Sequence, residues 1–134
     1  MSRTELREHI FRMLFRIEFN SEEEMKDQET FFFEELEAAT GKDEAYILNK
    51  YRMIVEKKEE IDALLNEVTE GWKTSRMNRV DLTILRLATY EIKWDEDVPM
   101  GVAINEAVEL AKKYSSDEGP SFVNGVLAKV VNQE

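Results

Sequence analysis

Hydrophobic positions recur at helical spacing along most of the chain. Over residues 4–19, one apolar row follows the i, i+4, i+7, i+8 spacing of a buried helix face. Its members are Leu6, Ile10, Met13, Leu14 and Ile17. A second row holds Phe11, Phe15 and Phe19, so this helix has more apolar surface than one packing face needs. Either both rows are core, or part of the phenylalanine row contacts a partner.

A second helix is predicted over residues 21–39. Ser21 is followed three residues later by Glu24, which is the pattern of a capping box. Glu22 and Glu23 suit the positive end of the helix dipole, so this acidic run is interpreted as a solvated first turn and not as a metal site. The segment Thr40-Gly41-Lys42 is expected to end the helix.

Residues 43–71 carry a heptad repeat of apolar side chains at Ile47, Ile54, Ile61 and Val68. A parallel row of Tyr51, Lys58, Leu65 and Trp72 is interrupted by Lys58. The segment is either one long helix or two helices that meet near residues 57–59. Two helices are favoured, because one helix would be long for a compact domain of this size. Gly71 is expected to mark the end.

Residues 78–93 form the most apolar segment, with hydrophobic residues around nearly the whole circumference of a helix. Such a helix is typical of the centre of a bundle. Its charged residues Asp81, Arg86 and Glu91 are then partly buried and need partners. Arg86 is expected to be an ion-paired residue of the scaffold.

Two further helices complete the prediction. Pro99 fits the first turn of one helix, and its buried face contains Ile104, Ala107, Val108 and Ala111. Residues 115–121 are expected to form a loop. The last helix then turns Val123, Val126, Leu127 and Val130 inward. Gly125 lies inside it, where Gly costs about 1 kcal/mol relative to Ala, so close backbone packing is expected there. No segment has the alternating pattern of a strand. The expected fold is all-α, with residues 1–134 forming a single compact domain.

Composition argues against catalysis. The chain has 134 residues and no cysteine, which excludes disulfides, thiolate metal sites and cysteine nucleophiles. His9 is the only histidine, too few for a histidine-rich zinc site or a catalytic triad. Glycine-rich phosphate-binding loops are also missing. We therefore expect no enzyme activity, no cofactor and no metal.

The net charge of −11 disfavours non-specific binding of nucleic acid. The negative charge is concentrated in residues 21–70, which carry six basic and sixteen acidic residues. Either end of the chain could therefore present a neutral or basic surface. The first residues lack the apolar run of a signal peptide, and no stretch approaches the ~20 apolar residues of a membrane span. A cytoplasmic protein without membrane contact is expected.

Three sequence blocks resemble one family. The first is Asp81-x-x-Ile84-Leu85-Arg86-x-Ala88-x-x-Glu91, and the second runs from Val98-Pro99 through Ala103-Ile104-Asn105-Glu106-Ala107 to Lys112. The third is Phe122-Val123-Asn124-Gly125-Val126-Leu127. In order and spacing they resemble the NusB family of bacterial transcription antitermination factors. The resemblance implies about seven helices in two sub-bundles. It also implies pairing with NusE, a small-subunit ribosomal protein, and binding of the pair to boxA RNA in ribosomal RNA leaders. RNA polymerase and other Nus factors would join indirectly.

The resemblance also implies where the partners bind. RNA binding maps to the N-terminal arginines and to the loop entering the last helix, which here means Arg3, Arg7, Ser121, Phe122 and Asn124. NusE binding maps to the first and fifth helices, which here means Phe15, Phe19 and Asp81.

Two alternatives stay open at this point. The chain could be a protein-only interaction module or a homodimer through the phenylalanine row, with weak or no RNA binding. It could also correspond to the NusB-like domain found beside RNA methyltransferases, which a length of 134 residues disfavours.

Overall fold

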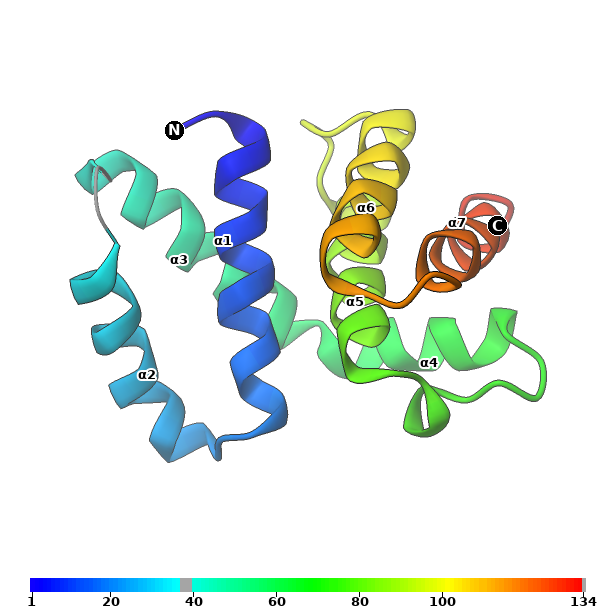
Figure 1. The fold of residues 1–134 in the computed structure, drawn as a ribbon, viewed down its shortest axis with the longest axis horizontal. Helices are drawn as coiled ribbons and strands as arrows, with labels where there is room; N and C mark the ends of the chain where they lie inside the picture. Colours follow the sequence, from blue (N-terminus) through cyan, green and yellow to red (C-terminus); the bar gives the residue numbers. More distant parts are fainter. Residues whose placement is uncertain (37–39, 134) are drawn as a thin grey trace. The chain divides into compact units, whose positions relative to one another are not determined.

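The computed structural model describes residues 1–36 and 40–133. Within these ranges the chain forms seven α-helices and two short 3-10 helices, η1 and η2 (Figure 1). The α-helices are α1 (Arg3–Phe15), α2 (Glu22–Glu35), α3 (Gly41–Glu56), α4 (Lys58–Val68), α5 (Arg79–Trp94), α6 (Met100–Tyr114) and α7 (Gly119–Val131). They divide into two compact units, Met1–Val55 and Glu56–Glu134. The predicted all-α fold with two sub-bundles is confirmed.

The first unit is built around the apolar face of α1. Leu6, Ile10, Met13 and Leu14 are all buried, as the periodicity predicted, and Phe11 is buried with them. The α-helix stops at Phe15, and Arg16–Glu18 continue as the 3-10 helix η1. The predicted helix over residues 4–19 was therefore placed correctly, but its last turn is tighter than expected.

The capping box that begins α2 is confirmed. The backbone N–H of Glu24 donates to Ser21 Oγ over 3.1 Å, and the backbone N–H of Ser21 donates to Glu24 Oε1 over 2.9 Å. The helix ends at Glu35. The predicted extension over residues 37–39 lies outside the described residues.

The interpretation of Thr40-Gly41-Lys42 as a helix end was wrong, because these residues begin α3. The backbone N–H of Asp43 donates to Thr40 Oγ1 over 3.1 Å, and the backbone N–H of Thr40 donates to Asp43 Oδ2 over 3.3 Å. The side chain of each residue thus accepts a hydrogen bond from the backbone N–H of the other, as in a capping box. This pattern outweighs the usual role of Gly as a helix terminator.

Two helices occupy residues 43–71, as favoured above. Lys57 separates α3 from α4. The second helix ends at Val68, and Gly71 follows with a φ of +76°. Only glycine adopts this left-handed conformation without strain, so Gly71 marks the turn that the sequence predicted.

The second unit has α5 at its centre, in contact with α4, α6 and α7 (Figure 1). Every residue from 81 to 91 of α5 is buried. Arg86 is paired as expected: its Nε and Nη2 each donate to a carboxylate oxygen of Asp62 on α4 over 2.9 Å. This bidentate pair fixes α4 against α5.

Three details of the last helices differ from the prediction. Pro99 is the N-cap residue just before α6, and α7 begins at Gly119, inside the predicted loop 115–121. Gly125 is exposed and has no atom within 4 Å of an added Cβ, so the expected close packing is wrong there. Close packing occurs at Gly119 instead, where a Cβ would collide with the Ser115 side chain. No helix in the described part of the chain is long and apolar enough to cross a membrane.

Candidate nucleic-acid and partner interface

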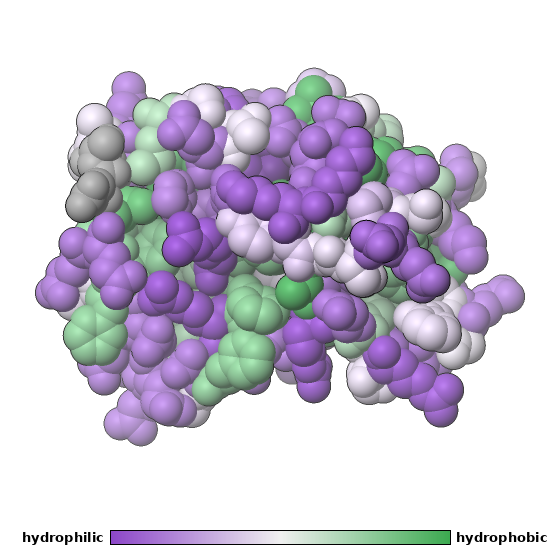
Figure 2. Space-filling model, in the orientation of Figure 1, coloured by the Kyte–Doolittle hydropathy of each residue, from purple (hydrophilic) through white to green (hydrophobic). Residues whose placement is uncertain are grey.

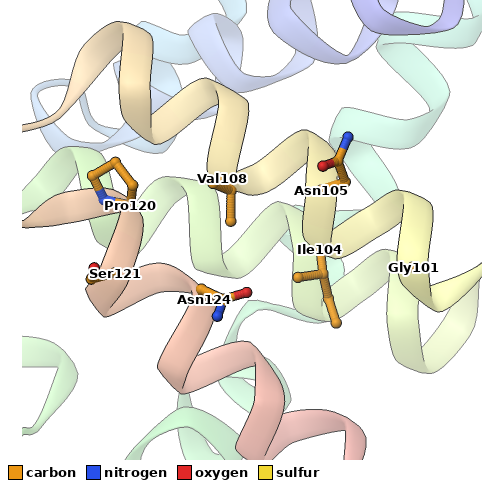
Figure 3. A pocket seen from close by; sticks show the side chains of 7 residues that line it. All are labelled: Gly101, Ile104, Asn105, Val108, Pro120, Ser121 and Asn124. Carbon is orange, nitrogen blue, oxygen red and sulfur yellow. The ribbon is translucent and has the colours of Figure 1, made fainter.

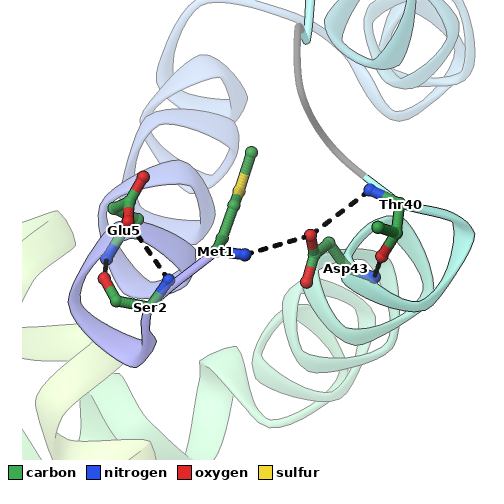
Figure 4. A network of polar contacts seen from close by, with 5 residues as sticks. All are labelled: Met1, Ser2, Glu5, Thr40 and Asp43. Carbon is green, nitrogen blue, oxygen red and sulfur yellow. Dashed lines mark hydrogen bonds and ion pairs between the residues drawn. The ribbon is translucent and has the colours of Figure 1, made fainter.

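The start of α1 is held by a network of caps (Figure 4). The backbone N–H of Glu5 donates to Ser2 Oγ over 3.1 Å, and the Ser2 backbone N–H donates to Glu5 Oε1 over 3.2 Å. These bonds, the backbone one first, hold the pKa of Glu5 below its usual value. The N-terminal amine of Met1 lies 3.4 Å from Asp43 Oδ2, at the first turn of α3. The beginnings of α1 and α3 are therefore tied together.

Arg3 and Arg7 differ in how much of each side chain is exposed to solvent and could contact a phosphate. Arg3 is exposed, and its Nη1 donates to the Tyr46 hydroxyl on α3 over 2.8 Å. Its guanidinium also lies 5.1 Å from the centre of the Tyr46 ring, and the Lys50 ammonium lies 5.6 Å from the same ring. Arg7, in contrast, is only 6% exposed. Of the two predicted RNA contacts on α1, Arg3 has the free surface for a phosphate.

The start of α7 is fixed from α5. Ser115 Oγ donates to Asp81 Oδ1 over 2.5 Å, and an added Cβ on Gly119 would lie 3.2 Å from the same oxygen. Pro120 follows in the first turn, where a missing N–H removes no helical hydrogen bond. The result is that Ser121, Phe122 and Asn124 all lie on the first two turns of α7, whereas Ser121 was expected in the loop 115–121. Ser121 and Asn124 are exposed, and Phe122 is half-buried.

A groove of about 510 Å³ lies between α6 and α7 (Figure 3). Figure 3 shows Ile104 and Val108 extending from α6 toward the side where Asn124 lies, whereas Asn105 extends the other way. Ser121 and Pro120 complete the α7 side. The groove thus combines an apolar wall with hydroxyl and amide groups, which suits a planar polar ligand.

A second cavity, of about 270 Å³, also has Ser121 in its lining. Phe122, Gly125 and Lys129 contribute to it from α7, and Trp72 contributes from the segment after α4. The Trp72 and Phe122 ring centroids are 6.1 Å apart. The predicted RNA residues of α7 therefore line two neighbouring hollows.

The phenylalanine row runs from α1 to the residue after η1 and changes from core to surface in that direction. Phe11 is buried, Phe15 is half-buried and Phe19 is 66% exposed. The Phe15 and Phe19 rings meet edge to face, with centroids 5.1 Å apart. On the face shown in Figure 2, hydrophilic residues predominate and hydrophobic side chains reach the surface only in places. An exposed ring such as Phe19 is therefore a candidate contact for another macromolecule.

Comparison with known proteins decides the family. The NusB family model matches residues 4–132. The transcription antitermination protein NusB of Lachnoclostridium phytofermentans is 52% identical over 132 residues, which cover 98% of this chain and 100% of that protein. The chain belongs to the NusB family.

Solved NusB structures share the fold. Thermotoga maritima NusB superposes with a TM-score of 0.87 at 34% identity, covering 100% of this chain and 93% of that one. A crystal structure of the antitermination factors NusB and NusE in complex with double-stranded RNA gives a TM-score of 0.83 at 24% identity. That match covers 97% of this chain and 96% of the other, and it supports the fold alone.

Family membership settles the class of function. The protein is a NusB-type transcription antitermination factor. It is not an enzyme, as its composition predicted, because the family is non-enzymatic. No group of side chains in the described ranges forms a candidate metal site.

The predicted RNA-binding residues are divided between the two units. Ser121, Phe122 and Asn124 share the start of α7, whereas Arg3 and Arg7 lie one turn apart on α1 in the other unit. Asp81, a predicted NusE contact, is 6% exposed and holds Ser115.

The sequence prediction did not single out Trp72, which lines the second cavity, because its place in a heptad row suggested core. Two features of the sequence could have indicated an exposed Trp72. It follows Gly71, where the helix was expected to end, and it precedes the basic residues Lys73, Arg76 and Arg79.

Proposed function

We propose that this chain binds the boxA element of nascent RNA as a heterodimer with NusE and so supports ribosomal RNA transcription in the cytoplasm. The observation that carries the proposal is the 52% identity to a transcription antitermination protein NusB over nearly the whole chain. The solved complex of NusB and NusE with double-stranded RNA shows that a protein of this fold joins both kinds of partner.

The RNA site that we propose is formed by Arg3, Arg7, Ser121, Phe122 and Asn124. A guanidinium such as that of Arg3 can grip a phosphate with two parallel hydrogen bonds. Unpaired bases stack on aromatic rings such as Phe122, and hydroxyl and amide groups such as those of Ser121 and Asn124 read base edges. Because Arg7 is largely buried, its contribution depends on the small part of the side chain that reaches the surface.

The NusE site that we propose includes Phe15, Phe19 and Asp81. The exposure of Phe19 supports it, since a large exposed ring at the end of a helix suits a protein contact. A partner with basic surface would also offset part of the −11 net charge that disfavours RNA binding by the chain alone. We further propose that residues 1–134 act as a single domain in this complex.

The proposal is tested by titrating a boxA RNA oligomer with this protein, alone and with NusE, over a series of salt concentrations. A scrambled oligomer of the same length is the control. We expect tight, salt-dependent binding that strengthens with NusE and weakens for the scrambled RNA. Absence of salt-dependent RNA binding in both conditions would contradict the proposal and would favour a protein-only interaction module or a homodimer.

A further inference from the structure

Trp72 is an exposed aromatic side chain on a rigid backbone. Its ring is 53% exposed, although burying an indole is strongly favourable. The backbone N–H of Trp72 donates to the carbonyl of Thr69 over 2.7 Å, and Trp72 in turn accepts a hydrogen bond from Thr69 Oγ1 over 2.8 Å. Thr69 is itself buried, and its single hydroxyl hydrogen is shared between the Trp72 carbonyl and the Leu65 carbonyl of α4, which lies 2.6 Å from Oγ1. The indole is therefore presented to solvent by a fixed turn and not by a loose loop.

The exposed indole forms one wall of the 270 Å³ cavity, and Phe122 forms another. Their ring planes are inclined at 60°, so neither ring covers the face of the other. The cavity that both rings line, at about 270 Å³, is smaller than the roughly 300–1,000 Å³ of a pocket for a drug-sized molecule. It suits a single planar ring that stacks on one aromatic wall and touches the other.

Gly125 keeps the floor of this cavity open. A glycine weakens a helix interior relative to alanine, yet no protein atom lies within 4 Å of the position that a Cβ would take here. Packing within the described chain therefore gives no reason for this glycine. Its place in the lining of the cavity gives one, because a side chain would enter the open space.

The two charged residues that line the cavity balance each other, and the segment that follows Trp72 in the sequence is basic. Lys129 lines the cavity from α7, opposed by Glu70 as the acidic residue of the lining. The segment after Trp72 adds Lys73, Arg76 and Arg79 without an acidic residue among them. In a chain with a net charge of −11, this is a local excess of basic residues beside an exposed indole.

We propose that Trp72 and Phe122 form a stacking platform for one unpaired base of single-stranded RNA, with Lys129 contacting the adjacent phosphate. Proteins that bind single strands combine a stacking ring with basic side chains along the backbone in this way. The platform extends the RNA site from the start of α7 to the turn after α4. It rests on the proposed function, because it names further residues of the same RNA site.

The test measures binding of a single-stranded boxA oligomer to the complex with NusE, for Trp72→Ala, Trp72→Phe and Lys129→Gln. Trp72→Ala should weaken binding roughly tenfold, as expected for one lost stacked base. It should leave the slope of log K against log salt unchanged, since an indole carries no charge. Trp72→Phe should recover most of the affinity. Lys129→Gln should reduce the slope by about 0.7, as expected for one lost phosphate contact on a single strand.

Two controls make the result specific. Met100→Ala removes a side chain of equal exposure, 54%, from α6 of the same unit and should leave RNA affinity unchanged. In a Trp94→Phe background, Trp72 is the sole tryptophan, and its fluorescence should change on addition of RNA but not of NusE alone. Unchanged helical circular dichroism would show that each variant is folded.

Three outcomes would overturn the platform. If the wild-type complex binds RNA and Trp72→Ala binds equally well, the platform is wrong while the proposed function stands. If Trp72→Ala weakens NusE binding and Trp72 responds to NusE alone, the indole is a protein contact. If the wild-type complex binds no RNA, the platform fails together with the proposed RNA function.

Discussion

Two of the charged residues buried in the described part of the chain are compensated by a neighbouring polar side chain. Arg86 is buried and is held by both oxygens of Asp62. Asp81 is buried and accepts the Ser115 hydroxyl. His9 is different: its Nδ1 is buried, and no hydrogen-bond partner for it occurs among the described residues. Its ring instead meets Phe32 of α2 edge to face, 6.0 Å between centroids.

Because His9 is partly buried in this way, the free energy of unfolding should depend on pH. Burial, followed by repulsion from Arg12, lowers the pKa of His9 below its usual value. The unfolded chain then binds a proton more readily than the folded chain does. Stability should therefore be full above about pH 6.5, the ordinary histidine value, and should fall as pH decreases toward the lowered folded pKa. Urea unfolding between pH 5 and pH 8 measures the free energy of unfolding as a function of pH. The variant His9→Gln should show a flatter dependence on pH. An identical slope in the variant would show that other groups cause it.

Helices as elements were largely predictable from the sequence, but their ends were not. The apolar periodicity located α1, α2 and α5, and the charged Lys58 in a heptad row indicated the break between α3 and α4. The errors occurred where two local signals compete. Gly41 suggested a helix end, but the Thr40–Asp43 cap made it a beginning. A loop was expected at residues 115–121, but Pro120 fits a first helical turn, and the helix begins at Gly119, where Ser115 leaves no room for a side chain.

The two glycines of α7 should respond to alanine with opposite signs. At Gly119 a Cβ would collide with Ser115, and Asp81 leaves little room to move, so Gly119→Ala should destabilise the protein by about 1–3 kcal/mol. At Gly125 the Cβ would meet nothing, so Gly125→Ala should stabilise it by about 1 kcal/mol through helix propensity. Denaturant unfolding of both variants gives the two values. Equal effects would mean that α7 does not begin against Ser115.

For the whole molecule, charge and exposed rings are distributed unevenly. Residues 21–70 carry most of the negative charge. Large exposed hydrophobic side chains include Phe19, Phe31 and Trp72. Such surfaces suit a protein that works in an assembly, in which a basic partner and an RNA cover different parts of it.

Phe19 should matter for the partner and not for folding. Phe19→Asp replaces a ring that is 66% exposed, so the fold should remain while the affinity for NusE falls at least tenfold. Phe31→Asp is the matched control, since Phe31 is 51% exposed on α2 and is not among the predicted contacts. Calorimetric titration with NusE compares them. Equal losses for both variants would assign the effect to added negative charge.

The family resemblance predicts an RNA site at the start of α7, and the structure adds details of burial and pairing that the sequence does not contain. The sequence could not show that Arg7 is buried or that Asp81 is occupied by Ser115, because both facts depend on tertiary packing. It also could not show that Trp72 is exposed beside Phe122, since residues 72 and 122 meet only in the folded second unit. Periodicity predicts which residues can be core, and only packing decides which are.

The most direct test of the account is to cross-link boxA RNA carrying photoreactive uridines to the complex with NusE and to identify the modified peptides by mass spectrometry. We predict modification within residues 114–129, the tryptic peptide that contains Ser121, Phe122 and Asn124, with competition by unmodified boxA RNA but not by a scrambled oligomer. Cross-links confined to other parts of the chain, or to NusE alone, would contradict the central claim that the start of α7 contacts the RNA.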